Sequence, residues 1–219
     1  MVIAIDGPAG SGKSTVAHRI AEMLHITFLN SGSFYRAITL ALLRAGSIDI
    51  RDSAPHFLQP QDAIVSFVQA LQLEYRDAHL ILNGEDVEEL LHSDIIDACA
   101  SPVSAIVPVR HIVNVHLRKI AQTMSIVCEG RDMTTVVFPD ADYKFYLDAS
   151  IDVQAERRFK QGVSNLSFEE IKARIQKRDA LDRHKAEGSL KIAGDAVYID
   201  TSDLTIEQVC EIIIHKIHV

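Results

Sequence analysis

The chain has 219 residues, of which 47% are hydrophobic and 24% are charged, and its formal net charge is −8. This is an ordinary globular composition, and the length suits one α/β domain with an insertion or two small domains. The acidic balance argues against a polymeric nucleic acid as partner, because such binders usually present a basic face. No apolar run reaches the roughly 18–20 residues of a membrane span and no signal peptide fits the start, so we expect a cytoplasmic protein without a membrane partner.

The first part of the chain predicts a strand, a loop and two helices. Val2–Asp6 is a short apolar run that ends at glycine, as is typical of a buried strand. Gly7–Gly12 is a loop of glycine, proline, alanine and serine. Lys13–Leu24 and Gly32–Ala45 carry apolar residues at helical spacing.

The middle of the chain predicts a small β-rich insertion at about 60–92 within a single domain of 1–219. A helical pattern at Ala63–Leu71 precedes two short strands, Leu73–Arg76 and Leu80–Asn83, on either side of Asp77-Ala78. Asn83-Gly84 is a turn signal. Helical patterns then resume over Ile95–Gln122.

The last part of the chain alternates strands with helices. Strands are expected at Ser125–Cys128, Tyr143–Leu147 and Ala196–Ile199, helices at Ile151–Lys160, Phe168–Leu181 and Thr205–Ile217, and a polar loop at Gln161–Ser167. This alternation predicts an α/β fold with a mostly parallel sheet that helices cover on both faces.

A phosphate-binding motif, G-x-x-x-x-G-K-[ST], lies between the first strand and the first helix. Its residues are Gly7, Pro8, Ala9, Gly10, Ser11, Gly12, Lys13, Ser14 and Thr15. The glycines let several backbone N–H groups point into one concavity, and the helix N-terminus adds its dipole. Lys13 would meet the β and γ phosphates and the Ser14 hydroxyl would ligate Mg²⁺. A chance glycine-rich turn is the alternative, and the flanking strand and helix argue against it.

Nucleotide binding alone leaves the activity open. An Asn-Lys-x-Asp motif, which a GTPase would carry, does not occur in the sequence. A kinase needs a second anion site built from arginines. Ser31 and Arg36 lie where the second helix begins, with Ser31 as its expected cap. They fit such a site and fit equally well a capped helix with a solvated arginine.

Polar residues also follow the strand at Ser125–Cys128. Ligands of open α/β sheets bind at the carboxyl ends of strands. There Glu129 could hold Mg²⁺ through water, Arg131 could bind a phosphate and Asp132 could accept from an exocyclic amine. A local ion pair in a turn is the alternative, which the position at a strand end weakens.

Two further pairs of charged residues have two readings each. Arg178 and Asp182 are four residues apart, which is routine for a surface ion pair on a helix. Arg157 and Arg158 could be a basic helix face, or part of a lid that closes over the transferring phosphoryl group at about 150–167.

Nearly end to end, the sequence resembles the bacterial cytidylate kinase family. The resemblance rests on the loop at 7–15, Ser31–Arg36, the run Gly130–Ala141 (GRDMTTVVFPDA), the strand Phe145–Ser150 and the insertion segment Leu80–Val87. It implies a P-loop kinase with a small nucleotide-binding insertion and a short helical lid. It also implies transfer of the γ-phosphoryl group of ATP to CMP or dCMP, with Mg²⁺, by a cytoplasmic monomer.

The resemblance also implies roles for individual residues. Ser101, Arg110 and Asp132 would read the cytosine. Arg36 and Arg131 would hold the acceptor phosphate. Arg178 and Asp182 would contact the ribose, and Arg157 and Arg158 would belong to the lid.

Three residues depart from the family pattern. Thr134 stands where glycine is usual, which predicts a less free turn, and Asn30 replaces a common Asp. Lys185 stands where a phosphate-binding arginine is expected, and it keeps the charge but loses the planar fork. Two alternatives remain: another small-molecule kinase, such as an adenylate or shikimate kinase, and an ATP-dependent regulator without turnover.

Overall fold

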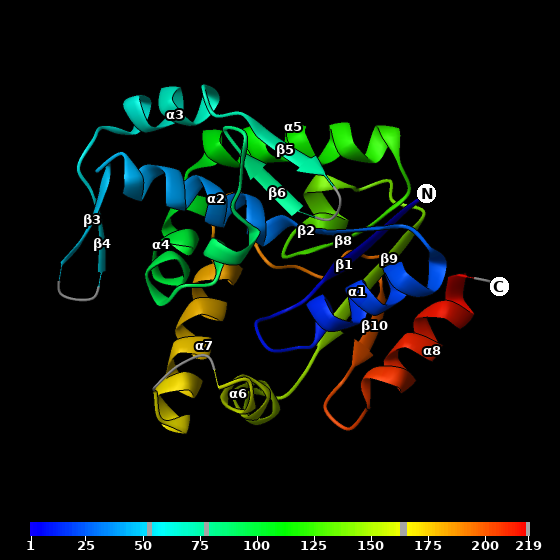
Figure 1. The fold of residues 1–219 in the computed structure, drawn as a ribbon. Helices are drawn as coiled ribbons and strands as arrows, with labels where there is room; N and C mark the ends of the chain where they lie inside the picture. The colour runs from blue at the N-terminus through cyan, green and yellow to red at the C-terminus, as the bar shows by residue number, and fades with distance from the viewer. Residues whose placement is uncertain (52–53, 77–78, 163–165, 218–219) are drawn as a thin grey trace. The chain divides into compact units, whose positions relative to one another are not determined.

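The computed structural model describes residues 1–51, 54–76, 79–162 and 166–217. These residues divide into two compact units, Met1–Leu29 with Ala121–Val219, and Asn30–Ile120 (Figure 1). We call them the discontinuous unit and the continuous unit. Asp77-Ala78 and positions 163–165 of the expected polar loop lie outside the described residues.

A five-stranded sheet carries the discontinuous unit, with the strand order β10-β9-β1-β8-β2. The strands are β1 (Val2–Asp6), β2 (Thr27–Asn30), β8 (Ile126–Gly130), β9 (Tyr143–Asp148) and β10 (Val197–Asp200). β10, β9, β1 and β8 run parallel, and the register pairs Ile5 with Glu129 and Asp6 with Gly130. Ile3, Ala4 and Ile5 are each 0% exposed, so both faces of β1 are covered. This is the mostly parallel α/β sheet that the alternation of elements predicts.

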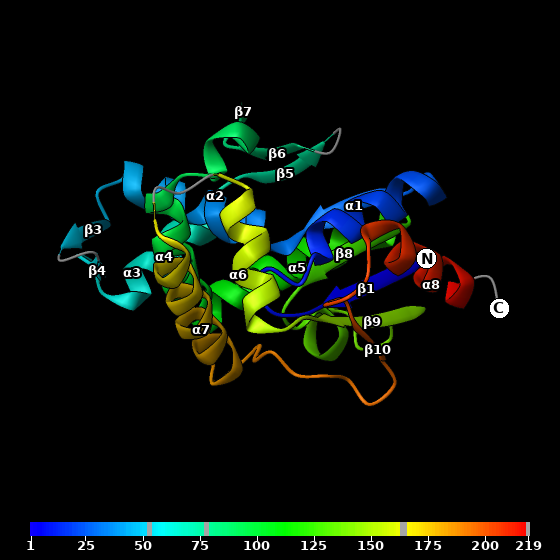
Figure 2. The same ribbon diagram turned by 90° about the horizontal axis from the view of Figure 1, so that it is seen from below.

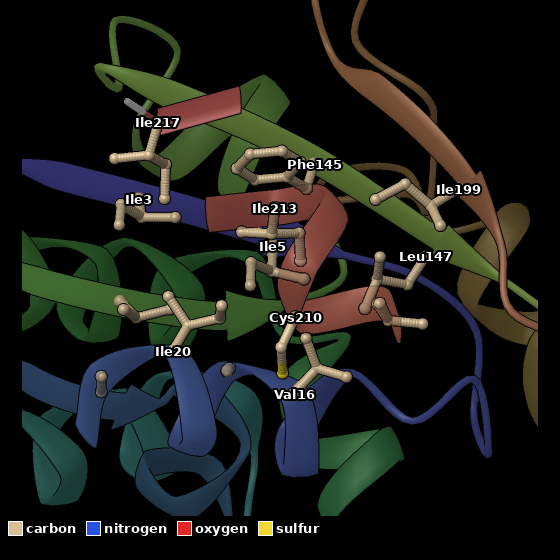
Figure 3. Close-up of a cluster of buried hydrophobic side chains, with 14 residues drawn as sticks. Ile3, Ile5, Val16, Ile20, Phe145, Leu147, Ile199, Cys210, Ile213 and Ile217 are labelled. Atoms are coloured by element: carbon tan, nitrogen blue, oxygen red, sulfur yellow. The ribbon is translucent and has the colours of Figure 1, made fainter. Parts of the chain in front are cut away.

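The helices of this unit are α1 (Lys13–Leu24), the π-helix η2 (Met133–Val137), α6 (Ile151–Lys160), α7 (Phe168–Arg183) and α8 (Ile206–Ile217). In the core, Val16 and Ile20 of α1 and Ile213 of α8 point toward Ile5 and Phe145 of the sheet (Figure 3). This packing fixes the start of α1, and with it the phosphate loop, against the end of β1.

The helices α6 and α7 lie side by side (Figure 2) and bury a small cluster of their own around Ala155, Ile171 and Ile175. Ser167 begins α7 with a capping box, because its hydroxyl and backbone exchange hydrogen bonds with Glu170. The two helices therefore form one packed pair, and this pair carries Arg157, Arg178 and Asp182.

The continuous unit holds the remaining elements. They are α2 (Ser31–Arg44), β3 (Ile48–Arg51), β4 (Ala54–Phe57), α3 (Gln61–Gln69), β5 (Leu73–Arg76), β6 (His79–Leu82), β7 (Glu85–Asp86), the 3-10 helix η1 (Glu88–Leu91), α4 (Asp94–Ser104) and α5 (Val107–Thr123). Asn83 and Gly84 have φ values of 51° and 84°. Both positive values are typical of a tight hairpin turn, which confirms the turn predicted there.

Several expected boundaries need correction. Asn30, not Ser31, caps α2, because its side chain accepts a hydrogen bond from the backbone N–H of Gly32 at 2.8 Å. Glu129 and Gly130 belong to β8 and do not follow it. The helical stretch at 95–122 is two helices, since it breaks between Ser104 and Val107.

Among the described residues, no single helix is long and apolar enough to cross a membrane. Ile95–Ser104 and Val107–Thr123 meet that test only as a pair, and the pair is bent by 97°.

Candidate active site

The phosphate loop is tightly enclosed by the elements around it. A Cβ on Gly7 would lie 2.1 Å from the Leu147 carbonyl oxygen, so a side chain cannot fit there. Gly10 has φ +74°, and a Cβ on it would lie 2.9 Å from backbone atoms of Gln154 in α6. Glycine at these two positions therefore lets β9 and α6 pack directly against the loop.

Lys13 is held inside the loop. Its Nζ donates to the Pro8 carbonyl at 2.8 Å and lies 4.0 Å from Oε2 of Glu129. Burial, helped by the nearby charge of Arg131, lowers the pKa of Lys13 from 10.5 to about 7. An incoming anion would reverse that effect, since an opposite charge favours the protonated amine.

Ser14 and Glu129 form a pair of oxygen ligands beside Lys13. The Ser14 hydroxyl donates to Oε1 of Glu129 at 2.8 Å. A hydroxyl and a carboxylate are the hard ligands that Mg²⁺ prefers, and it keeps several waters when it binds to few protein groups. The donor set therefore fits a magnesium ion.

A buried ion cluster links Arg131 to α7. Oδ2 of Asp182 accepts from Nε of Arg131 at 2.9 Å, and Oδ1 lies 2.7 Å from Nζ of Lys185. Burial raises the pKa of Asp182, but the two cations outweigh it and lower the pKa to about 2. Asp182 is 2% exposed, so the reading of Asp182 as half of a solvated surface pair is wrong.

Asp132 lies next to this cluster in the chain, between β8 and η2, and it is 2% exposed. Because Asp132 is buried, its carboxylate is already removed from water when no ligand is bound. It can therefore discriminate strongly between a ligand group that donates a hydrogen bond and one that accepts.

Comparisons with known proteins agree over nearly the whole chain. The family described as cytidylate kinase matches residues 3–219. A cytidylate kinase of Caldanaerobacter subterraneus subsp. tengcongensis is 42% identical over 95% of this chain and 91% of its own. One of Borreliella burgdorferi (strain ZS7) is 38% identical over 99% of this chain and 96% of its own.

The chain belongs to the cytidylate kinase family.

Solved structures extend the likeness only to the fold. A shikimate kinase from Bacteroides thetaiotaomicron has a TM-score of 0.51 at 10% identity, covering 100% of this chain and 99% of its own. An uncharacterised protein from Eubacterium ventriosum has a TM-score of 0.54 at 14% identity, covering 100% and 98%. Together with the parallel sheet and the phosphate loop, they establish the P-loop kinase fold.

The residues that the family resemblance assigns to the acceptor divide between the two units. Arg131, Asp132, Arg178, Asp182 and Lys185 lie in the discontinuous unit, and Ser31, Arg36, Ser101 and Arg110 in the continuous unit. The ion cluster joins Arg131, Asp182 and Lys185 directly.

Within the continuous unit, each expected arginine has a defined partner. Nε and Nη2 of Arg36 donate to Oδ1 of Asp97 at 3.0 and 2.9 Å. The side chain is 16% exposed, so the solvated arginine considered for this helix is wrong.

Ser104 links Ser101 and Arg110 by hydrogen bonds to both residues. Arg110 is 3% exposed, and its Nη1 donates to the Ser104 carbonyl at 3.0 Å. The Ser104 hydroxyl donates to the Ser101 carbonyl at 2.8 Å. Arg110 also lies over the ring of Tyr35, 5.7 Å from its centroid.

Arg157 and Arg158 differ in their surroundings although they are neighbours in α6. Arg157 donates to the hydroxyl and the carbonyl of Thr201 at 2.9 and 2.6 Å, which holds its guanidinium beside the phosphate loop. Arg158 is exposed and donates to the side chain of Gln161 at 3.0 Å. The interpretation as part of an exposed basic helix face therefore fits Arg158 only, whereas the Arg157 side chain faces inward.

Three polar residues at the site have no counterpart in the sequence-based expectations. The Thr201 hydroxyl donates to the Ser11 carbonyl at 3.0 Å, and Asp179 accepts from the backbone N–H of Ala9 at 3.1 Å. Asp6 accepts three hydrogen bonds from Met133 and Thr134. Each contact joins residues more than a hundred positions apart, and no local motif signals it.

Proposed function

We propose that this protein transfers the γ-phosphoryl group of ATP to CMP or dCMP and releases ADP with CDP or dCDP. Membership of the cytidylate kinase family over residues 3–219 carries this conclusion. The relatives that are at least 38% identical over nearly their whole length bear the same name.

The donor side would be formed by residues 7–15. Backbone N–H groups and Lys13 would surround the β and γ phosphates, and the helix dipole of α1 adds to the positive potential. Ser14, and Glu129 through water, would hold Mg²⁺, which supplies charge neutralisation when bound. The acceptor is already an anion, so no strong general base is needed and direct in-line transfer suffices.

The acceptor phosphate would be bound by Arg36, Arg131 and Lys185. Arg131 and Lys185 share one carboxylate, Asp182, so together they keep a net positive charge available for an anion. Ser31 would also contact the acceptor nucleotide. Arg178 and Asp182 would meet the ribose, and Arg157 and Arg158 would act at the transferring phosphoryl group.

Cytosine would be read by Ser101, Arg110 and Asp132. Cytosine offers an N4 amine, which a carboxylate accepts, whereas uracil presents a carbonyl oxygen at that position. Two facing acceptors leave a buried polar group unpaired, at a cost of about 1–3 kcal/mol. We therefore expect CMP to be preferred to UMP.

The remaining assignments follow the family resemblance. The segment at about 60–92 would be the acceptor-binding insertion, and about 150–167 the lid of one kinase domain that spans 1–219. The enzyme would act as a monomer in the cytoplasm, without nucleic-acid or membrane partners. Gel filtration with light scattering tests the monomer directly.

One assay separates this function from its alternatives. ADP release is measured with ATP, Mg²⁺ and one acceptor at a time, across CMP, dCMP, UMP, AMP, GMP and shikimate. We expect turnover with CMP and dCMP far above the others. Preference for AMP or shikimate would instead identify another small-molecule kinase, and ATP binding without any turnover would identify a regulator.

A further inference from the structure

Asp6 is the last residue of β1 and stands directly before the phosphate loop. It is 0% exposed. Oδ1 accepts from the backbone N–H of Met133 at 2.8 Å, and Oδ2 accepts from the backbone N–H and the hydroxyl of Thr134 at 2.7 and 2.6 Å. A buried carboxylate is costly unless donors satisfy it, so these contacts hold η2 firmly to the end of β1. We call this set of hydrogen bonds the Asp6 clamp.

The clamp fixes one end of a very short segment. Arg131 and Asp132 lie between β8, which ends at Gly130, and η2, which begins at Met133. Gly130 pairs with Asp6 in the sheet register. Both ends of the two-residue segment are therefore tied to the same residue, Asp6, by sheet pairing on one side and by the clamp on the other.

The contribution of Thr134 can be separated from that of the backbone. Any residue at 133 and 134 except proline offers the two N–H donors, but the short hydroxyl donor at 134 requires serine or threonine. Thr134 is 1% exposed, so its hydroxyl has no competing water at the surface. The side chain thus adds the third donor and stiffens the start of η2.

We propose that Asp6 and Thr134 are positioning residues that orient Arg131 and Asp132 toward the acceptor nucleotide, and that they thereby set the preference for cytosine over uracil. This inference rests on the proposed function, because it takes Arg131 and Asp132 as acceptor ligands. Neither Asp6 nor Thr134 needs to touch the nucleotide.

Two variants of Thr134 test the proposal. Thr134→Val removes the hydroxyl at nearly constant volume, and Thr134→Ser keeps the hydroxyl as the matched control. For each protein we would measure KM for CMP, KM for ATP, and the ratio of kcat/KM for CMP to that for UMP. The expected result for Thr134→Val is a rise of about fivefold to tenfold in KM for CMP and a lower CMP-to-UMP ratio.

KM for ATP should change by less than about twofold in Thr134→Val. The two backbone N–H donors still hold Asp6, which stands directly before the phosphate loop. Thr134→Ser should restore most of the wild-type values. A Thr134→Val enzyme with a lower melting temperature but wild-type KM for CMP and wild-type ratio would overturn the proposal and leave a purely structural clamp. A wild-type enzyme that does not phosphorylate CMP would refute the proposed function itself, and with it the assignment of Asp132.

Discussion

Lys13 is a basic side chain that the protein buries before any phosphate arrives. Its Nζ donates to the Pro8 carbonyl at 2.8 Å, and burial lowers its pKa to about 7. We expect Lys13→Ala to retain the fold and to lower kcat by about two to four orders of magnitude, because positioned charge is a main source of catalysis in phosphoryl transfer. Coupled ADP release measures the rate, and circular dichroism checks the fold. Retained activity would contradict the role assigned to Lys13.

Asp6 gives a prediction about stability and pH. Burial raises its pKa from 3.8 to about 6, although the hydrogen bonds from Thr134 and Met133 oppose the shift. The folded state thus keeps a proton that the unfolded state has lost over this range. The stabilising contribution is fully present below pH 3.8 and is lost as the pH rises through about 6.

Asp6→Asn removes this titration and leaves the other groups in place. The free energy of unfolding of the wild type, minus that of the variant, should therefore fall between about pH 4 and pH 6 and be constant above about pH 7. Urea unfolding of both proteins across this range measures the difference. A difference that does not depend on pH would show that Asp6 keeps an ordinary pKa in the folded protein.

The helix α6 packs directly against the phosphate loop, and glycine makes that approach possible. Gly10 has φ +74°, and a Cβ on it would lie 2.9 Å from the Gln154 backbone, whereas Gly46 has φ +63° with nothing within 4 Å of its Cβ position. Both glycines adopt left-handed backbone, so alanine strains both alike, by about 1 kcal/mol. Only at Gly10 does alanine also push α6 away from the loop.

We expect Gly10→Ala to lower kcat/KM for ATP at least about tenfold, and Gly46→Ala to leave it within about twofold while lowering the melting temperature slightly. Steady-state kinetics and thermal unfolding of the two variants provide the comparison. Equal loss of activity in both would mean that backbone strain alone, and not the packing of α6, is responsible.

The predicted elements were most accurate where a single periodic pattern decided them. α1 and α6 begin and end at the predicted residues, as does β1. β2, β3, β4 and β7, which are two to four residues long, were missed, because so few side chains seldom establish an alternating pattern. β5 and β6 are equally short but were recognised beside the Asn83-Gly84 turn signal. The break between α4 and α5 was missed as well, since apolar spacing continues across it.

At the scale of the whole molecule, the residues proposed to bind ATP and those proposed to bind the acceptor are distributed differently between the two units. Residues 7–15 all belong to the discontinuous unit, whereas the residues proposed as acceptor ligands include Arg36 and Arg110 of the continuous unit and Arg131 of the discontinuous unit. Hydrogen exchange can follow this division. We expect ATP with Mg²⁺ to protect mainly the loop and α1, and CMP to protect segments in both units.

The Lys13→Ala variant is the control for that experiment, because it should lose the protection by ATP and keep the protection by CMP. Protection by CMP confined to one unit would contradict the assignment of acceptor residues to both.

Prediction of the site, like prediction of the fold, succeeded where a local sequence pattern was present. The phosphate loop is a local motif whose glycines and lysine are contiguous, and Lys13, Ser14 and Glu129 do come together. Thr201 and Asp179 act through one hydrogen bond each to a loop that precedes them by more than 150 residues, as the pairs Ser11–Thr201 and Ala9–Asp179 show. Single polar residues are common in any chain, so only the three-dimensional structure could select these two.

The connectivity of the sheet has a consequence for synthesis on the ribosome. β1 is made first, but its neighbours β8 and β9 begin only at Ile126 and Tyr143. The central strand β1 therefore stays unpaired while residues 30–120 are synthesised. These residues form one continuous stretch of the chain, which can fold on its own. Nascent chains should acquire the continuous unit first, and the nucleotide-binding loop should take shape only after β8 and β9 have emerged.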